Sequence, residues 1–181
     1  MKKIAVLLSG AGTNFAHIVK TLHGNGYEVA VAITNNPEAG GIRIAKEAGI
    51  PLEVVEPSGF ESRETFDAEV VARLHRYRPD LTVLAGFMRI LTPVFTEQIR
   101  AINLHPSLLP RHKGLNAIRK SYEDAYHEGG VSVHYVSSVL DGGEIILQKT
   151  ISKAGIDYET YERKIRTAEK ELLVEAIRKV L

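Results

Sequence analysis

Residues 4–15 read Ile-Ala-Val-Leu-Leu-Ser-Gly-Ala-Gly-Thr-Asn-Phe, and this stretch decides the fold. Five apolar residues in a row, Ile4 to Leu8, are typical of a strand buried on both faces, as in a parallel sheet. A glycine loop follows this run. Apolar positions then recur at helical spacing, at Phe15, Ile18, Val19 and Leu22. The stretch therefore predicts a strand, a glycine loop and a helix in succession.

The same alternation continues toward the middle of the chain. Apolar runs predict further strands at residues 29–33, 52–55 and 81–85, with helices between them, one of which we expect to begin at Asn35-Asn36-Pro37. Four strands alternating with helices predict an α/β fold with an open, mostly parallel twisted sheet and flanking helices, similar to a Rossmann fold.

The second half of the sequence has another pattern. A short strand is expected at 102–104 and a helix at 117–127, and extended runs at 131–136 and 145–151 flank the turn signal Asp141-Gly142-Gly143. We therefore expect an antiparallel strand here and a long terminal helix over 158–180. The prediction is one domain over residues 1–181, with halves 1–100 and 101–181.

Composition excludes several classes of protein. The chain has no cysteine, so thiol nucleophiles, zinc–thiolate sites and iron–sulfur clusters are ruled out. Its 23 Lys and Arg against 22 Asp and Glu give a net charge of +1 with no basic block, which argues against nucleic acid as a partner. The apolar run in Met1–Leu8 is too short for the core of a signal peptide, and a glycine loop follows it instead of a cleavage site. We expect a cytoplasmic protein with small-molecule substrates.

The glycine loop is suited to a phosphate, because backbone N–H groups and the positive end of a helix meet there. We expect Gly12, Thr13 and Asn14 to supply the donors. The loop is not a dinucleotide fingerprint, since its third glycine would fall at Phe15 and no acid follows the second strand. It also lacks the lysine of a P-loop. The alternative is a turn that merely needs glycine.

Asn103 and His105 lie two residues apart, which places both side chains on one side of a short strand. Imidazole can shuttle a proton near neutral pH, and an amide can donate to an oxyanion. Asp141 is the candidate carboxylate that would complete the set. Spacing alone does not bring Asp141 to His105, and a single histidine at a strand end is more often structural.

Four motifs then carry a resemblance that covers nearly the whole chain. They are Leu-Ala-Gly-Phe-Met-Arg-Ile-Leu at 84–91, Asn-Leu-His-Pro-Ser-Leu-Leu-Pro at 103–110, Ser-Val-His-Tyr-Val at 132–136 and Leu-Asp-Gly-Gly at 140–143. Together with the glycine loop, they strongly resemble the phosphoribosylglycinamide formyltransferase family of purine biosynthesis. The resemblance implies that 10-formyltetrahydrofolate is the co-substrate, that its formyl group passes to the amine of glycinamide ribonucleotide, and that no metal is needed.

The resemblance also implies residue roles. Asn103 and His105 would stabilise the oxyanion of a tetrahedral intermediate, His105 would donate the proton, and Asp141 would hold the imidazole in its charged form. The nucleotide would be bound by Gly12, Thr13, Asn14 and Glu169. The folate would be bound by Arg63, Met88, Arg89, Ile90, Leu91, Asn103, Ser137, Ser138, Val139, Leu140 and Asp141.

Two segments depart from the family pattern. Ser138 stands where an acidic residue is usual, and Arg111-His112-Lys113 is more polar than the aromatic-containing segment expected there. No metal-ligand spacing links His112, His127 and His134, which we interpret as surface or structural groups.

Alternative functions remain open. The same residues would serve a 10-formyltetrahydrofolate hydrolase or a formyltransferase acting on another small amine. A third alternative is a ligand-binding domain without activity. At 181 residues, we expect no appended recognition domain of the kind found in methionyl-tRNA formyltransferase. We expect a monomer or a homodimer.

Overall fold

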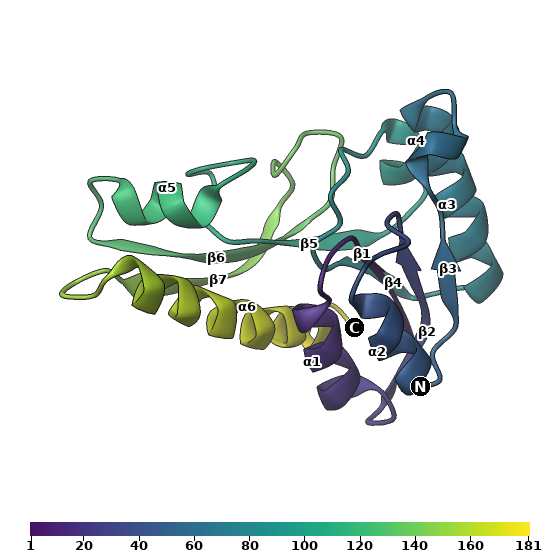
Figure 1. Ribbon diagram of the computed structural model, residues 1–181, viewed down its shortest axis with the longest axis horizontal. Coiled ribbons are helices and arrows are strands. Elements are labelled where there is room, and N and C mark those ends of the chain that lie inside the picture. Colours follow the sequence, from purple (N-terminus) through teal and green to yellow (C-terminus); the bar gives the residue numbers. More distant parts are fainter. The chain divides into compact units, whose positions relative to one another are not determined.

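The computed structural model describes residues 1–181, and the chain divides into two compact units (Figure 1). The first unit comprises residues 1–102 with Leu181, and the second comprises residues 103–180. Strand β5 (Ala101–His105) contributes its first two residues to the first unit and its last three to the second. The prediction that all 181 residues form one domain stays a prediction.

The first unit is built on four parallel strands. These are β1 (Lys2–Leu8), β2 (Tyr27–Thr34), β3 (Leu52–Val54) and β4 (Leu81–Leu84), in the order β3-β2-β1-β4. Ile4 to Leu8 are at most 1% exposed, because β1 lies between two neighbouring strands and its two faces are covered. The expectation of a doubly buried strand before the glycine loop is confirmed.

Four α-helices and one short 3₁₀ turn complete the first unit. They are α1 (Thr13–Leu22), α2 (Gly41–Glu47), α3 (Arg63–Tyr77), α4 (Pro93–Thr96) and the 3₁₀ turn Pro57–Gly59. Helix α3 begins with a capping box, in which the Ser62 hydroxyl accepts from the Thr65 N–H and the Thr65 hydroxyl accepts from the Ser62 N–H.

Helix α2 does not begin at Asn35-Asn36-Pro37, so that prediction was wrong. Asn36 instead forms a turn, in which its N–H donates to the Thr34 hydroxyl and its side-chain oxygen accepts from the Glu38 N–H. Short polar side chains compete with a helix in this way. The helix starts only at Gly41, where the backbone lies against β1 and leaves no space for a side chain beside Leu8.

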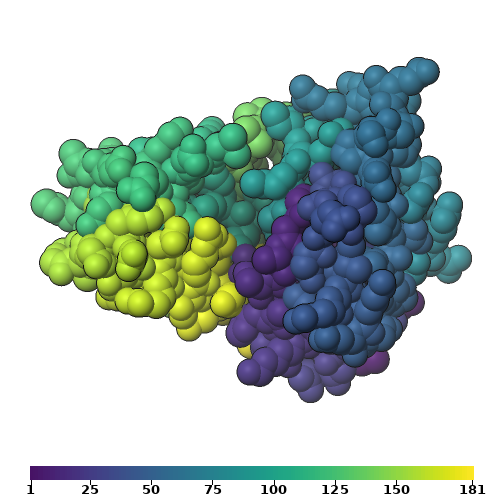
Figure 2. All heavy atoms as spheres, in the orientation of Figure 1, coloured from purple at the N-terminus to yellow at the C-terminus, as the bar shows by residue number.

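The second unit combines an antiparallel strand pair with a long helix. Strands β6 (Glu128–Tyr135) and β7 (Ile145–Ser152) are antiparallel, and α6 (Tyr158–Val180) packs along both. Helix α5 (Ala117–Glu123), green in Figure 2, lies beside the yellow α6. Helix α5 ends four residues before the predicted 127, because the backbone of Asp124 is extended.

The core under α5 and α6 contains Ile118, Tyr161 and Ile165. Gly129 faces the Tyr161 hydroxyl so closely that no side chain fits there. The antiparallel strand and the long terminal helix were both predicted, and the α/β fold with a mostly parallel sheet is confirmed. None of the helices combines the length and the apolar character needed to cross a membrane.

Candidate active site

The second unit brings the three predicted catalytic residues together. His105 Nδ1 lies 3.5 Å from Asp141 Oδ2, and Asn103 Nδ2 lies 3.4 Å from Asp141 Oδ1. Asn103 and His105 come from β5, and Asp141 comes from the loop between β6 and β7. His105 is 6% exposed and Asp141 is 8% exposed, so their interaction is only weakly screened by water.

The Nε2 atom of His105 faces an atom that can only accept a hydrogen bond. His105 Nε2 lies 2.8 Å from the main-chain oxygen of His112. A carbonyl oxygen only accepts, so Nε2 carries a hydrogen, and Nδ1 is the nitrogen that faces the carboxylate of Asp141. When Nδ1 also carries a proton, both N–H groups meet an acceptor. The surroundings therefore accommodate the imidazolium ion.

His134 is part of this cluster, and sequence reasoning missed it. Its ring is 2% exposed, its Nδ1 lies 2.8 Å from the Tyr135 carbonyl oxygen, and its Nε2 lies 3.1 Å from Asn103 Nδ2. Its Nδ1 therefore donates to this oxygen, and its Nε2 faces both the amide nitrogen of Asn103 and, at 3.6 Å, Asp141 Oδ1. The available signal was the alternation of Ser132 and His134, two polar residues on one face of a buried strand.

Asp141 is held in position by the backbone around it. Its φ of 50° is left-handed, and its Oδ2 accepts from the Gly114 N–H at 2.9 Å. Burial works to raise the pKa of the Asp141 carboxyl. The contacts with His134, the Gly114 N–H and His105 outweigh burial, so the pKa lies below the ordinary value of an aspartate. Asp141 is consequently a carboxylate at neutral pH.

The predicted phosphate loop lies in the first unit. Gly12 has a φ of 80° and precedes the first residue of α1, Thr13, while Asn14 lies in the first turn. A Cβ at Gly12 would lie 2.8 Å from the Cα of Gly41, so only glycine fits. The loop thus leads directly into a helix N-terminus, as expected of a phosphate-binding turn.

The predicted folate segment 88–91 is also in the first unit and is fixed at its first residue. The Met88 N–H donates to the Ser9 hydroxyl at 2.8 Å, and that hydroxyl donates to Asn35 Oδ1 at 2.6 Å. Met88 is 68% exposed and Ile90 is 51% exposed. Sequence reasoning missed Ser9 and Asn35, because this contact joins residues far apart in the chain.

A second contact fixes the segment just beyond its end. Asp67, fully buried on α3, accepts from the N–H and the hydroxyl of Thr92, both at 2.7 Å. The guanidinium of Arg89 lies 4.3 Å from the centre of the Phe66 ring. The segment that carries Met88, Arg89, Ile90 and Leu91 is therefore attached to β1 at one end and to α3 at the other.

The remaining predicted residues are distributed over both units. Arg63 is the exposed first residue of α3. Ser137, Ser138, Val139 and Leu140 precede Asp141 in its loop, with Val139 59% and Leu140 49% exposed. Glu169 lies on α6 of the second unit, is 4% exposed and pairs with Arg166 at 3.0 Å.

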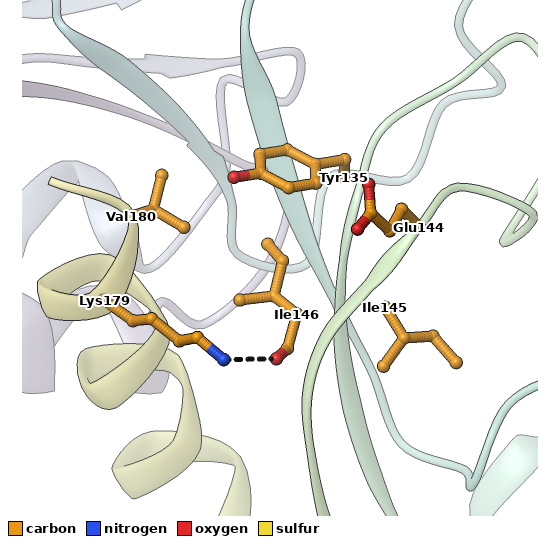
Figure 3. Close-up of a pocket in the computed structure, with 6 residues that line it drawn as sticks. All are labelled: Tyr135, Glu144, Ile145, Ile146, Lys179 and Val180. Atoms are coloured by element: carbon orange, nitrogen blue, oxygen red, sulfur yellow. Dashed lines mark hydrogen bonds between the residues drawn. The ribbon is translucent and has the colours of Figure 1, made fainter.

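Two surface hollows lie away from the predicted site residues. In the second unit, a hollow of about 240 Å³ is lined by Tyr135, Glu144, Ile145, Ile146, Lys179 and Val180. Figure 3 shows the Lys179 ammonium reaching the main-chain oxygen of Ile146, at 3.3 Å. In the first unit, a hollow of about 330 Å³ lies beside the end of α3 and the start of β4. Neither contains a predicted residue, and no group of three or more metal-ligating side chains is arranged for an ion.

Comparison with known proteins gives consistent matches. The chain matches the formyl transferase family over residues 2–177. It is 39% identical over 171 residues to the phosphoribosylglycinamide formyltransferase of Escherichia coli, with 92% of this chain and 81% of that protein covered. It is also 38% identical over 156 residues to part of the trifunctional purine biosynthetic protein adenosine-3 of Drosophila melanogaster, covering 83% of this chain and 12% of that protein.

Solved structures give the same result. The crystal structure of phosphoribosylglycinamide formyltransferase from Campylobacter jejuni matches with a TM-score of 0.97 and 44% identity, over 99% of this chain and 97% of that one. Sequence and fold therefore agree over nearly all residues. The chain belongs to the formyl transferase family, within its group of phosphoribosylglycinamide formyltransferases.

Proposed function

We propose that this chain transfers the formyl group of 10-formyltetrahydrofolate to the amine of glycinamide ribonucleotide, and that Asn103, His105 and Asp141 catalyse the transfer. The observation that carries the proposal is the buried His105, which lies between the carboxylate of Asp141 at 3.5 Å and the carbonyl of His112 at 2.8 Å. Family membership supports the reaction, and this cluster supports the residues.

The chemistry requires a proton and an oxyanion partner. Attack of the amine on the formyl carbon forms a C–N bond and a tetrahedral intermediate with a negative oxygen. Collapse of that intermediate breaks the bond to the folate nitrogen, which leaves with a proton. His105 would supply this proton as an imidazolium, and the charge of the imidazolium would stabilise the oxyanion. The proton that the attacking amine loses when it becomes an amide would return to the imidazole through water, so that the acid is regenerated. Asp141 would keep the imidazolium oriented.

Asn103 has a more specific role in this arrangement than simple oxyanion donation. Its amide nitrogen already faces two acceptors, His134 Nε2 at 3.1 Å and Asp141 Oδ1 at 3.4 Å. Two acceptors on one side fix which way the amide points. Its carbonyl oxygen is then the atom available to accept a hydrogen bond from the attacking amine. Asn103 would thereby align the nucleophile as well as contact the intermediate.

Substrate binding is assigned from the family pattern and from the placement of the loops. Gly12, Thr13, Asn14 and Glu169 would bind the nucleotide, with the phosphate on the N–H groups at the start of α1. The folate would be bound by Arg63, by Met88 to Leu91, by Ser137 to Asp141 and by Asn103.

Hydrolysis of the same folate is the alternative that the cluster leaves open, because His105 and Asp141 could serve water as the nucleophile. A spectrophotometric assay with 10-formyltetrahydrofolate, with and without glycinamide ribonucleotide, separates the two. The transferase requires the nucleotide for turnover. Turnover that does not depend on the nucleotide would contradict the proposal. Replacing the nucleotide by other small amines tests the remaining transferase alternative.

Localisation and assembly are predicted from the sequence. We infer a cytoplasmic location, where purine precursors and reduced folates are available, and a monomer or homodimer. Sedimentation analysis of the purified chain would decide between the two assemblies.

A further inference from the structure

A chain of partly buried polar contacts leads away from His105 on the side opposite Asp141. The first link is the main-chain oxygen of His112, 2.8 Å from His105 Nε2. No substitution at position 112 removes this oxygen, since it belongs to the backbone. Its placement depends on what holds residue 112 in its conformation.

His112 has a left-handed backbone, with a φ of 54°, which a residue other than glycine adopts only when its surroundings stabilise it. Its side chain supplies that stabilisation. The imidazole Nε2 lies 2.6 Å from Asp124 Oδ2, and both side chains are mostly buried. The ring of His112 is therefore anchored to the residue that follows α5.

Asp124 is in turn anchored by Lys153, the residue after β7. Lys153 Nζ lies 2.7 Å from Asp124 Oδ1, and only 9% of the lysine side chain is exposed. The same ammonium donates to the main-chain oxygens of Ser121, Tyr122 and Asp124, where α5 ends. Lys153 thus attaches Asp124 and the end of α5 to the end of β7.

The ionisation of Asp124 agrees with this arrangement. Burial works to raise the pKa of its carboxyl, but hydrogen bonds from Lys153, His112 and the Tyr126 N–H outweigh it. The pKa of Asp124 lies below its ordinary value. Both carboxylate oxygens carry a charge-assisted hydrogen bond, one from each neighbour.

We propose that Asp124 and Lys153 are positioning residues for His105. They act through the side chain of His112, which holds the His112 carbonyl against His105 Nε2 and so keeps Nδ1 directed at Asp141. The proposal rests on the proposed function for the role of His105 as the acid. The contact chain itself does not depend on that role.

The proposal also accounts for the polar segment Arg111-His112-Lys113. This segment was expected to contain an aromatic side chain, and in this chain it contains His112, which has a carboxylate partner in Asp124. A histidine at this position without Asp124 would leave a half-buried polar ring unpaired. His112 and Asp124 therefore depend on each other, and replacing either residue alone leaves the other without its partner.

The first part of the test uses the full chain and four single variants. Asp124→Asn leaves one oxygen to accept where two are needed, and Lys153→Met removes the ammonium. His112→Gly keeps the carbonyl and tolerates the φ of 54°, so it removes only the anchor. Glu123→Gln is the matched control, because Glu123 is also on α5 but forms an exposed pair with Arg119.

Two measurements are made on each variant. The first is the long-range ¹H–¹⁵N correlation spectrum of the histidine rings, which reports which nitrogen of His105 carries a hydrogen. The second is kcat and KM for both substrates. In Asp124→Asn, Lys153→Met and His112→Gly we expect a smaller population of the His105 tautomer with its hydrogen on Nε2. We also expect kcat to fall roughly 10- to 100-fold with little change in KM, because a displaced acid is no longer aligned with the reacting atoms.

The double variant Asp124→Asn with His112→Gly distinguishes loss of positioning from loss of activity caused by a less stable fold. Residues that act through one another give non-additive effects, so the double variant should lose no more kcat than the worse single variant. Lys153→Arg should keep most of the activity, since a cation remains. Additive losses, or His105 signals identical to those of the Glu123→Gln control, would overturn the proposal. Absence of formyl transfer by the unmodified chain would instead overturn the proposed function, and the ring spectra would still decide whether Asp124 positions His105.

Discussion

Gly12 and Gly41 approach each other so closely that a Cβ on Gly12 would lie 2.8 Å from the Cα of Gly41. This contact joins the start of α1 to the start of α2. It requires glycine at position 12 for a second reason as well, because the backbone there has a φ of 80°. The phosphate loop therefore owes its shape to a contact with a helix that is distant in sequence.

Gly12→Ala is expected to lower the free energy of unfolding by roughly 2–6 kcal/mol, since a left-handed alanine and an overpacked contact each cost about 1–3 kcal/mol. Binding of the nucleotide should be lost with it. Urea denaturation and calorimetric titration would measure the two effects. Gly10→Ala is the control, because a Cβ there meets nothing within 4 Å. Equal losses in both variants would show that the Gly41 contact is not responsible.

Ser9→Ala should raise the KM for 10-formyltetrahydrofolate more than the KM for the nucleotide. The variant leaves the Met88 N–H without its acceptor, and the loss of a hydrogen bond costs about 0.5–1.5 kcal/mol. We expect an increase of roughly tenfold, measured by steady-state kinetics. Asn35→Ala keeps the Ser9 oxygen as acceptor and should have a smaller effect. A larger effect of Asn35→Ala would refute this account of the segment.

His105→Ala should lower kcat roughly 10²- to 10⁴-fold, the usual contribution of a general acid. KM should change little, because His105 is proposed to act on the intermediate. His75→Ala serves as the control, since His75 is an exposed histidine in the last turn of α3. A His105→Ala variant as fast as the unmodified chain would rule out the mechanism.

The Asp141 carboxylate should contribute to stability in a pH-dependent manner. Its folded-state pKa is lowered, so its contribution is fully present above the unfolded-state pKa of about 3.9 and is lost as pH falls through the folded value. The unmodified chain should be more stable than Asp141→Asn by a constant margin above about pH 5, and the margin should shrink below about pH 4. Urea denaturation from pH 3 to pH 8 measures it. A margin undiminished at pH 3 would show that ionisation is not its source.

The sequence predicted those parts of the fold that depend on local pattern. The buried run Ile4–Leu8 and the periodic apolar positions of α6 specify their elements regardless of what surrounds them. The start of α2 and the existence of α4 could not be predicted in this way. Tertiary contacts set them, namely the packing of Gly41 against Leu8 and the hydrogen bonds from Thr92 to Asp67.

The candidate site, like the fold, could be predicted only where a local sequence pattern determines it. Asn103 and His105 were paired correctly by the period of a strand, which puts both on one side. Asp141 was a candidate because of its turn, but only the family resemblance linked it to His105, because the two residues are 36 positions apart and spacing carries no information over such a distance. Ser9 and His134 were missed, since each acts through a contact made only in the folded chain.

Strand β7 is the last strand of its sheet, and most of its residues are at least partly exposed. A strand with one open edge offers unpaired N–H and C=O groups to any other chain that comes near. Here the Lys179 ammonium already occupies the Ile146 carbonyl, and Lys149 places a charge in the middle of the strand, paired with Glu171. Lysines outside the catalytic cluster therefore protect this edge against sheet extension and aggregation. Substitution of these lysines should lower the solubility of the protein more than its catalytic rate.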